Sequence, residues 1–470
     1  MRISAVDTLQ ARLPDPLWER ARPLAEKFDE LLTGTDSASS AKRTSLSAFA
    51  IRVASAAVAF ASQVLLARLM GTFEYGIFTL VWISMVILGS LSCFGMQAAV
   101  VRFLPEYLRE SDFARMRGLL RTSRFFVLST STLAALIGAG AVYLASDLLA
   151  SHYVLPFLIA FIALPFLSLA DALECTGRAH GWAFRSLTPT YILRPALLFV
   201  FMLVAWMLDF PINGTTGVIC AVLATYMTTL GQLALIHRDV TREHSLTVAP
   251  ISELPVWLKV ALPIFLVEGF FFLLVHADIM MVGLLMQPEN VAVYFAAVKT
   301  LVLIQFVSFA VKAGVAHRFA AEINNTDKTA VRELAVKAAS WSFWPSAVLA
   351  CVLVAAGQLI LSLFGSEFVS GYSLLFVLVI GIVLRSTVGP AESLLTMTGH
   401  HKICAVIYAA VLAVNLVINA ALIPQFGLMG AAFATASATI LEALLLFIVV
   451  RRKIGVSMFA FAGPLPLRKM

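Results

Sequence analysis

The chain has 470 residues, of which 60% are hydrophobic and 13% are charged, and its mean hydropathy is +0.91. Soluble globular domains carry about 25% charged residues. The composition therefore excludes a water-soluble fold and indicates a chain that lies mostly in lipid. No nucleic-acid partner is expected.

The first 44 residues differ from the rest, because they contain seven basic and seven acidic residues. They include an amphipathic segment at 17–32, which could bind a membrane surface or a partner, and a polar segment at 33–45, which we expect to be a flexible tether. No apolar core of a signal peptide is present, so no cleaved signal is expected. A dispensable cytoplasmic extension is equally consistent with this composition.

Long apolar runs follow. The uncharged runs 75–101, 125–146, 210–236 and 338–366 each exceed the roughly 20 residues that cross a hydrocarbon core of about 30 Å. Together with spans that carry single charges, they predict an all-α integral membrane protein of about twelve transmembrane helices. In chain order these are 45–70, 74–101, 119–145, 153–175, 184–208, 214–237, 257–286, 290–314, 338–364, 370–396, 402–423 and 427–450.

Basic residues occur almost entirely in alternate connections between these helices. The connections near 71–74, 146–152, 209–213, 287–290, 365–369 and 424–426 contain no Lys or Arg. The positive-inside bias therefore predicts that both termini are cytoplasmic. We call the end of the bundle whose connections lack Lys and Arg the outer end and the opposite one the basic end. Arg68, near the outer end of the first helix, is the exception, and its long side chain could reach the interface.

The two parts of the membrane region resemble each other. "LECTGRAHGWA" at 173–183 resembles "LTMTGHHKICA" at 395–405, and "NGTTGVICAVLAT" at 213–225 resembles "FGLMGAAFATASA" at 426–438. Parallel repeats with a site between them are an architecture of transporters. We therefore expect two six-helix halves, related by a pseudo-twofold axis, around a central cavity. The predicted regions are an N-terminal extension at 1–44, a first half at 45–237, a linker at 238–256, a second half at 257–450 and a basic cytoplasmic tail at 451–470.

Charged residues inside the predicted helices are the candidate functional residues, since a charge in hydrocarbon is costly and normally faces protein or a water-filled cavity. The cations are Arg52, Arg194, Lys299 and Arg385. Candidates for ion coupling are Glu268, His276 and Asp278. Two interpretations remain open. The cations could line a substrate-binding cavity for an anionic headgroup, or cations and acids could pair with one another and only hold the bundle together.

Catalytic and metal motifs are absent from the sequence. There is no HExxH, no GxSxG and no phosphate-binding glycine loop. The five cysteines are scattered without a CxxC pair, which favours neither metal nor redox chemistry. We therefore expect no catalytic residue, no metal site and no cofactor, apart from coupling to H⁺ or Na⁺, and the protein is not expected to be an enzyme.

The segment "LLARLMGTFEYGIFTLV" at 65–81, followed by "RFLPEY" at 102–107, resembles the start of bacterial polysaccharide transporters, the Wzx-type oligosaccharide flippases. These belong to the multidrug, oligosaccharidyl-lipid and polysaccharide exporter superfamily. The Thr-Gly turns at 176–177 and 398–399 are also similar to that family. The resemblance covers about residues 45–450 and does not include the N-terminal extension.

The resemblance implies a function in the bacterial inner membrane. A flippase of this kind would move undecaprenyl-diphosphate-linked oligosaccharide across the membrane by alternating access, for exopolysaccharide, capsule or O-antigen synthesis. Its partners would be that lipid-linked substrate, membrane lipids and a polysaccharide polymerase or export machinery. The alternatives are a cation-coupled multidrug exporter of the same superfamily and a non-transporting scaffold of a polysaccharide machine.

Overall fold

A computed structural model describes residues 37–243, 248–323 and 328–462, and all regular elements in these ranges are helices. Side chains of residues 37–53 and of part of 313–329 are not described. The first half contains α3 (Ser37–Ser92), α4 (Met96–Arg109), α5 (Phe113–Leu144), α6 (Ser151–Ala179), α7 (Ala183–Thr188), the π-helical turn η1 (Pro189–Leu193), α8 (Arg194–Met207) and α9 (Gly214–Glu243).

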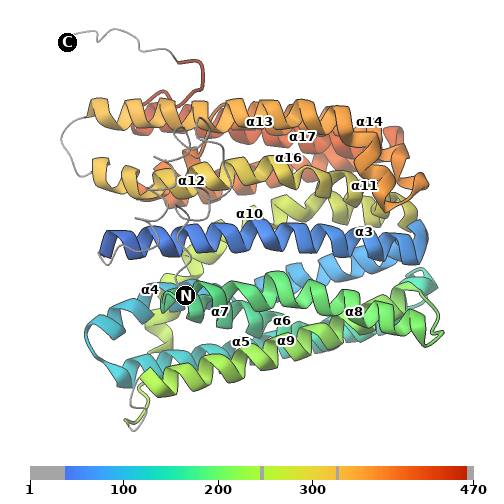
Figure 1. Ribbon diagram of the computed structural model, residues 1–470, viewed down its shortest axis with the longest axis horizontal. Helices are drawn as coiled ribbons and strands as arrows, with labels where there is room; N and C mark the ends of the chain where they lie inside the picture. The colour runs from blue at the N-terminus through green and yellow to red at the C-terminus, as the bar shows by residue number, and fades with distance from the viewer. Residues whose placement is uncertain (1–36, 244–247, 324–327, 463–470) are drawn as a thin grey trace, which may run out of the picture.

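The second half has the same plan. It contains α10 (Leu254–Leu285), α11 (Pro288–Thr300), α12 (Val302–Ile323), α13 (Lys328–Phe364), the 3-10 turn η2 (Ser366–Gly371), α14 (Tyr372–Ser386), α15 (Ala391–Met397), α16 (His401–Phe426) and α17 (Leu428–Lys453). Figure 1 shows the helices of each half running side by side, with α3 between the two groups.

The prediction of a twelve-helix all-α membrane protein is confirmed. Ten helices of the described residues are long and apolar enough to cross a membrane, and the pair α11–α12, bent by 41°, forms a further span. Helix α3 accounts for the twelfth, because Gly71 interrupts it with a φ of 73° and divides it into two helices. A left-handed backbone of this kind is adopted readily by glycine alone, so the predicted connection at 71–74 lies where the chain turns.

One prediction near the N-terminus differs from the structure, and a second concerns a segment outside the described residues. The predicted tether at 33–45 is helical from Ser37 onward, because α3 begins there. Its Ala, Lys and Arg residues are good helix formers and extend the first membrane helix. The amphipathic segment at 17–32 lies outside the described residues.

The second predicted helix, 74–101, is not continuous. It breaks between α3 and α4, where Phe94 has a φ of 46° and Gly95 a φ of 74°. Helix α10 crosses at this point. A Cβ atom on Gly95 would lie 2.5 Å from the carbonyl oxygen of Ala261 and 2.8 Å from Cβ of Phe265. The missing side chain therefore allows the two halves to approach closely at a helix break.

Three hydrophobic clusters show how the halves are joined. The largest contains residues of both halves, such as Tyr75 and Phe161 of the first and Phe295 and Leu375 of the second, and lies toward the outer end. At the basic end the second half has a cluster of its own. A third cluster at this end combines the first half with the start of α10, which contributes Trp257 and Ala261. One core thus joins the two halves at the outer end, whereas two separate clusters lie at the basic end, one of them with residues from both halves.

Two helices provide most of the contacts between the halves. Helix α3 packs against α11, α12 and α13, and α10 packs against α3 and α4. The fit of α3 to α11 is close, since a Cβ atom on Gly76 would overlap the backbone carbonyl of Pro288. This contact closes the outer end.

The segment after α17 was predicted to be a basic cytoplasmic tail, but its described part packs on the second half. Val456 and Met458 are buried, and the backbone N–H of Ala460 donates to the carbonyl oxygen of Thr387 at 2.8 Å. Thr387 lies in the break between α14 and α15. The apolar sequence "VSMFAFA" at 456–462 explains this packing, because burial of its side chains is favourable; the cytoplasmic location of the tail stays a prediction.

Candidate functional site: a cavity and buried charges between the halves

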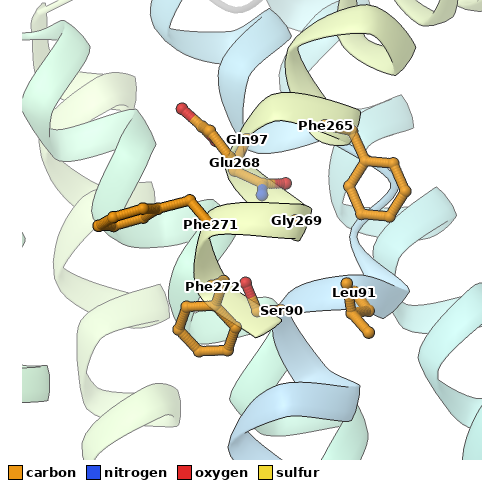
Figure 2. A pocket seen from close by; sticks show the side chains of 8 residues that line it. All are labelled: Ser90, Leu91, Gln97, Phe265, Glu268, Gly269, Phe271 and Phe272. Carbon is orange, nitrogen blue, oxygen red and sulfur yellow. The ribbon is translucent and has the colours of Figure 1, made fainter. Parts of the chain in front are cut away.

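A cavity of about 200 Å³ lies beside the break between α3 and α4. Its lining comes from both halves: Ser90, Leu91 and Gln97 of the first, and Phe265, Glu268, Gly269, Phe271 and Phe272 of α10. Figure 2 shows these side chains, with the amide of Gln97 reaching over α10 at Gly269 and with Ser90, Leu91 and Phe272 on the opposite rim.

Gln97 is a site residue that the sequence reasoning missed. Its Oε1 atom is buried and has no hydrogen-bond partner among the described residues. A buried polar atom without a partner is uncommon, so an amide of this kind on a cavity wall is available to a ligand. No clear signal in the sequence marked this residue, because Gly95 at the break lies in a run that is apolar on both sides.

Glu268 lies on the cavity wall between two ion pairs, one in each half. Its carboxylate is within electrostatic range of Arg178 and Lys312. Arg178 pairs with Glu174 at 3.6 Å in the first half, and Lys312 pairs with Glu392 at 3.3 Å in the second. Glu268 is therefore close enough to cations of both halves to interact with them electrostatically.

Arg194 begins α8, directly after the π-helical turn η1. Turns of this type are often found at functional sites. The guanidinium is within electrostatic range of Asp171 on α6, but it forms no ion pair among the described residues, and its Nε atom is buried without a hydrogen-bond partner. This cation therefore retains capacity to bind an anion.

Lys299 lies in the last turn of α11, just before the bend at Leu301. A cation is favoured there, because the carbonyl groups at the end of a helix carry partial negative charge. Its Nζ atom is 4.9 Å from the centre of the Phe295 ring, and within the described ranges it has no carboxylate partner.

His276 on α10 lies within electrostatic range of Lys299. Its Nδ1 atom is buried and unpartnered, and its ring packs edge-on against Phe272, 4.7 Å between centres. Since Phe272 lines the cavity, His276 and Lys299 extend the cavity region toward the middle of the second half.

Asp278, only 4% exposed, has different surroundings from Glu268. Tyr294 on α11 donates to its Oδ2 atom at 2.9 Å and Thr435 on α17 at 3.2 Å, and its Oδ1 atom accepts the N–H of Ile279. In the part of the chain that the structure describes, this carboxylate has only neutral hydrogen-bond donors and no cation beside it. The structure does not bring Glu268 and Asp278 into one group, although their helical spacing allowed it.

Arg385 differs from Arg194 and Lys299, because its guanidinium is fully engaged. Its Nε atom donates to Glu442 at 2.9 Å, Nη2 to Glu392 at 3.0 Å and Nη1 to the carbonyl of Gly389 at 2.9 Å. Glu392 also pairs with Lys312 at 3.3 Å. This network links α14, α15, α17 and α12 within the second half. The fourth predicted cation, Arg52, lies in α3, and its side chain is outside the described residues.

Two six-helix halves joined by one core toward the outer end, with a cavity that both halves line, have the architecture of a membrane transporter. Comparison with known families agrees with this class. A family model described as polysaccharide biosynthesis protein matches residues 42–316, more than half of the chain. The protein therefore belongs to that family, within the multidrug, oligosaccharidyl-lipid and polysaccharide exporter superfamily, which confirms the resemblance found in the sequence. A second model, MatE, matches residues 263–421.

Solved structures with the same fold come from this superfamily. An inward-facing multidrug resistance MATE family transporter of the MOP superfamily has a TM-score of 0.69 at 14% identity, over 85% of this chain and 94% of its own. An outward-facing structure with the same description has a TM-score of 0.63 at 15% identity, over 91% and 97%. The lipid II flippase MurJ, in an inward closed conformation, has a TM-score of 0.67 at 14% identity, over 86% and 87%. No protein of curated function matches the sequence.

Proposed function

We propose that this protein moves a lipid-linked oligosaccharide, with undecaprenyl diphosphate as the carrier, from the cytoplasmic to the outer leaflet for exopolysaccharide, capsule or O-antigen assembly. Membership of the polysaccharide biosynthesis protein family and the fold shared with a lipid II flippase support the substrate class. Translocation needs no covalent change in the substrate, so the proposal includes no enzymatic step.

The observation that carries the proposal is the pair Arg194 and Lys299. One cation lies in each half, both are deep in the bundle, and neither forms an ion pair within the described ranges. A diphosphate is an oxygen-rich anion, to which Arg offers two parallel N–H groups and Lys a point charge. Arg52, whose side chain is not described, is a third candidate. Arg385 is proposed to support the site by holding the second half together, since its donors are already occupied.

Alternating access explains how the substrate would cross. One core joins the two halves at the outer end, whereas the basic end has two separate clusters, one of which includes the start of α10; this difference favours a transporter closed toward the outside. Substrate would enter between the halves from the cytoplasmic side. A change in the relative populations of inward-facing and outward-facing states would then expose it to the other leaflet.

Asp278 is proposed to bind the coupling ion, H⁺ or Na⁺. A buried carboxylate with only hydroxyl and amide donors around it gains strongly from a proton or a cation. Tyr294 and Thr435 come from two other helices of the same half, so occupancy of Asp278 would change how α10, α11 and α17 pack. His276 and Glu268 are further candidates for this role.

The test compares surface glycan in cells that lack the native gene and carry a variant. Arg194→Ala and Lys299→Ala should each abolish the glycan while the protein stays in the membrane at normal abundance, and Arg194→Lys should recover part of it. Lys337→Ala is the matched control, because Lys337 is an exposed cation that, among the described residues, pairs only with Glu333 on its own helix. Normal export by the double alanine variant would refute a role of the two cations in binding.

A cation-coupled drug exporter is the second candidate, favoured by the MatE match over residues 263–421. Cells without the gene should then accumulate a cationic dye while their surface glycan is unchanged. If the protein is instead a scaffold of the polysaccharide machinery, both Arg194→Ala and Lys299→Ala should keep full surface glycan.

A further inference from the structure

Arg68 is the one cation near the outer end, and the structure shows what holds it. Its Nε atom donates to the carbonyl of Leu363 and its Nη2 atom donates to the carbonyl of Ser362 at 3.0 Å. Both acceptors lie in the last turn of α13, in the other half of the protein. The final carbonyls of a helix have no partner within the helix and carry partial negative charge, so the guanidinium caps α13 from across the interface.

A second bond lies beside the first. Thr72 Oγ1 donates to Glu367 Oε2 of η2 at 2.7 Å. Arg68 and Thr72 flank the turn at Gly71, and their three acceptors belong to consecutive parts of the second half. A single turn of the first half is thus bonded at two points to a single turn of the second.

Aromatic side chains from both halves pack close to these bonds. The ring centre of Tyr75 is 6.2 Å from that of Phe295 and 6.1 Å from that of Phe368, and Phe60 packs edge-on against Phe364 at 5.4 Å. These rings exclude water, but their contacts are non-directional. The hydrogen bonds are exposed and directional, so water can replace them when the halves separate.

We propose that Arg68 and Thr72 form an outer latch that keeps the outer end closed and sets the ratio of inward-facing to outward-facing protein. Each residue bonds across an interface that must separate during alternating access. The bonds exist only in the closed state, so their loss shifts the population toward the open state without changing the fold of either half. The inference does not depend on the identity of the substrate, because it concerns the empty protein.

The experiment measures the distance between spin labels on Asp147→Cys and Gln425→Cys, at the outer ends of the two halves, in nanodiscs without substrate and in a background free of native cysteines. Arg68→Met and Thr72→Val should each raise the ratio of long to short distances about tenfold, the effect of roughly one exposed hydrogen-bonding group. Thr216→Val is the control, because that hydroxyl bonds to Pro211 in its own half.

A crosslink provides a measurement that does not rely on the loss of a side chain. A short thiol crosslinker joining Thr72→Cys to Glu367→Cys should stop transport, and a cleavable linker should restore it after reduction. The latch is overturned if both single variants give the distances of the Thr216→Val control, or if transport continues at its full rate while positions 72 and 367 are joined.

Discussion

Two half-buried cations of the second half, Lys299 and Arg385, should respond in opposite ways to the same neutral substitution. Lys299→Met removes a charge that has no carboxylate partner and contacts the Phe295 ring. Arg385→Met removes a guanidinium that binds three acceptors. We expect the first variant to lose transport and keep its stability, and the second to lose stability.

The magnitude follows from the partners left behind. After Arg385→Met, Glu392 still has Lys312 at 3.3 Å, whereas Glu442, with a side chain only 10% exposed, has no other cation in the described structure. Breaking one buried ion pair costs about 3–5 kcal/mol. At about 2–4 °C per kcal/mol for a unit of about 200 residues, the Tm should fall by at least about 6 °C. Lys299→Met loses a cation–π contact of about 0.5–2 kcal/mol. It also removes the desolvation cost of a charge inside the bundle, so the two contributions to stability offset each other.

The assay is thermal unfolding of purified protein in detergent, followed by loss of monodisperse material on a sizing column, together with surface glycan in cells. The double variant Arg385→Met with Glu442→Gln removes both members of the broken pair and should recover most of the lost stability. A fall in Tm for Lys299→Met as large as that for Arg385→Met would contradict the reasoning, because Lys299 would then be a structural cation. An unchanged Tm for Arg385→Met would also contradict the reasoning, because the ion pairs of Arg385 would then contribute little to stability.

Further predictions concern coupling, the helix break and orientation. Asp278→Asn keeps acceptors for Tyr294 and Thr435 but removes the charge, so the protein should fold and its transport in proteoliposomes should no longer respond to a proton or sodium gradient; a response equal to wild type would exclude Asp278 as the coupling group. Gly95→Ala forces a Cβ atom against the Ala261 carbonyl at a positive φ, so Tm should fall by several degrees; an unchanged Tm would show that α10 can move away freely. In a cysteine-free background, an impermeant maleimide should label Ser366→Cys and not Ser111→Cys in intact cells, and the reverse would invert the proposed topology.

The helices were predictable because their signal is local. Apolar runs of about 20 residues give the spans, and breaks such as Gly71 and Gly427 give the turns, with positive φ values that glycine adopts readily. The interruption at Gly95 was not predicted, since the run around it stays apolar on both sides. Only the approach of α10, more than 160 residues later in the chain, accounts for a glycine there.

The candidate site was predictable in residue type but not in arrangement. Arg194, Lys299 and Arg385 look alike in the sequence, each a cation flanked by apolar residues well inside a predicted helix. Their partners come from other helices, so only the fold separates the engaged Arg385 from the two without an ion pair. Tyr294 and Thr435 gave no signal, because hydroxyl side chains are common in membrane helices and become ligands of Asp278 only through packing.

The return of the C-terminal segment to the break between α14 and α15 has a consequence for synthesis. Ala460 donates to the carbonyl of Thr387, so this turn lacks its partner until three further helices, α15, α16 and α17, have been made. The second half would then finish assembling only after α17 is inserted, when the apolar residues that follow it reach the break. A truncation a few residues before Val456 would leave every membrane helix in place and still expose that turn to quality-control proteases.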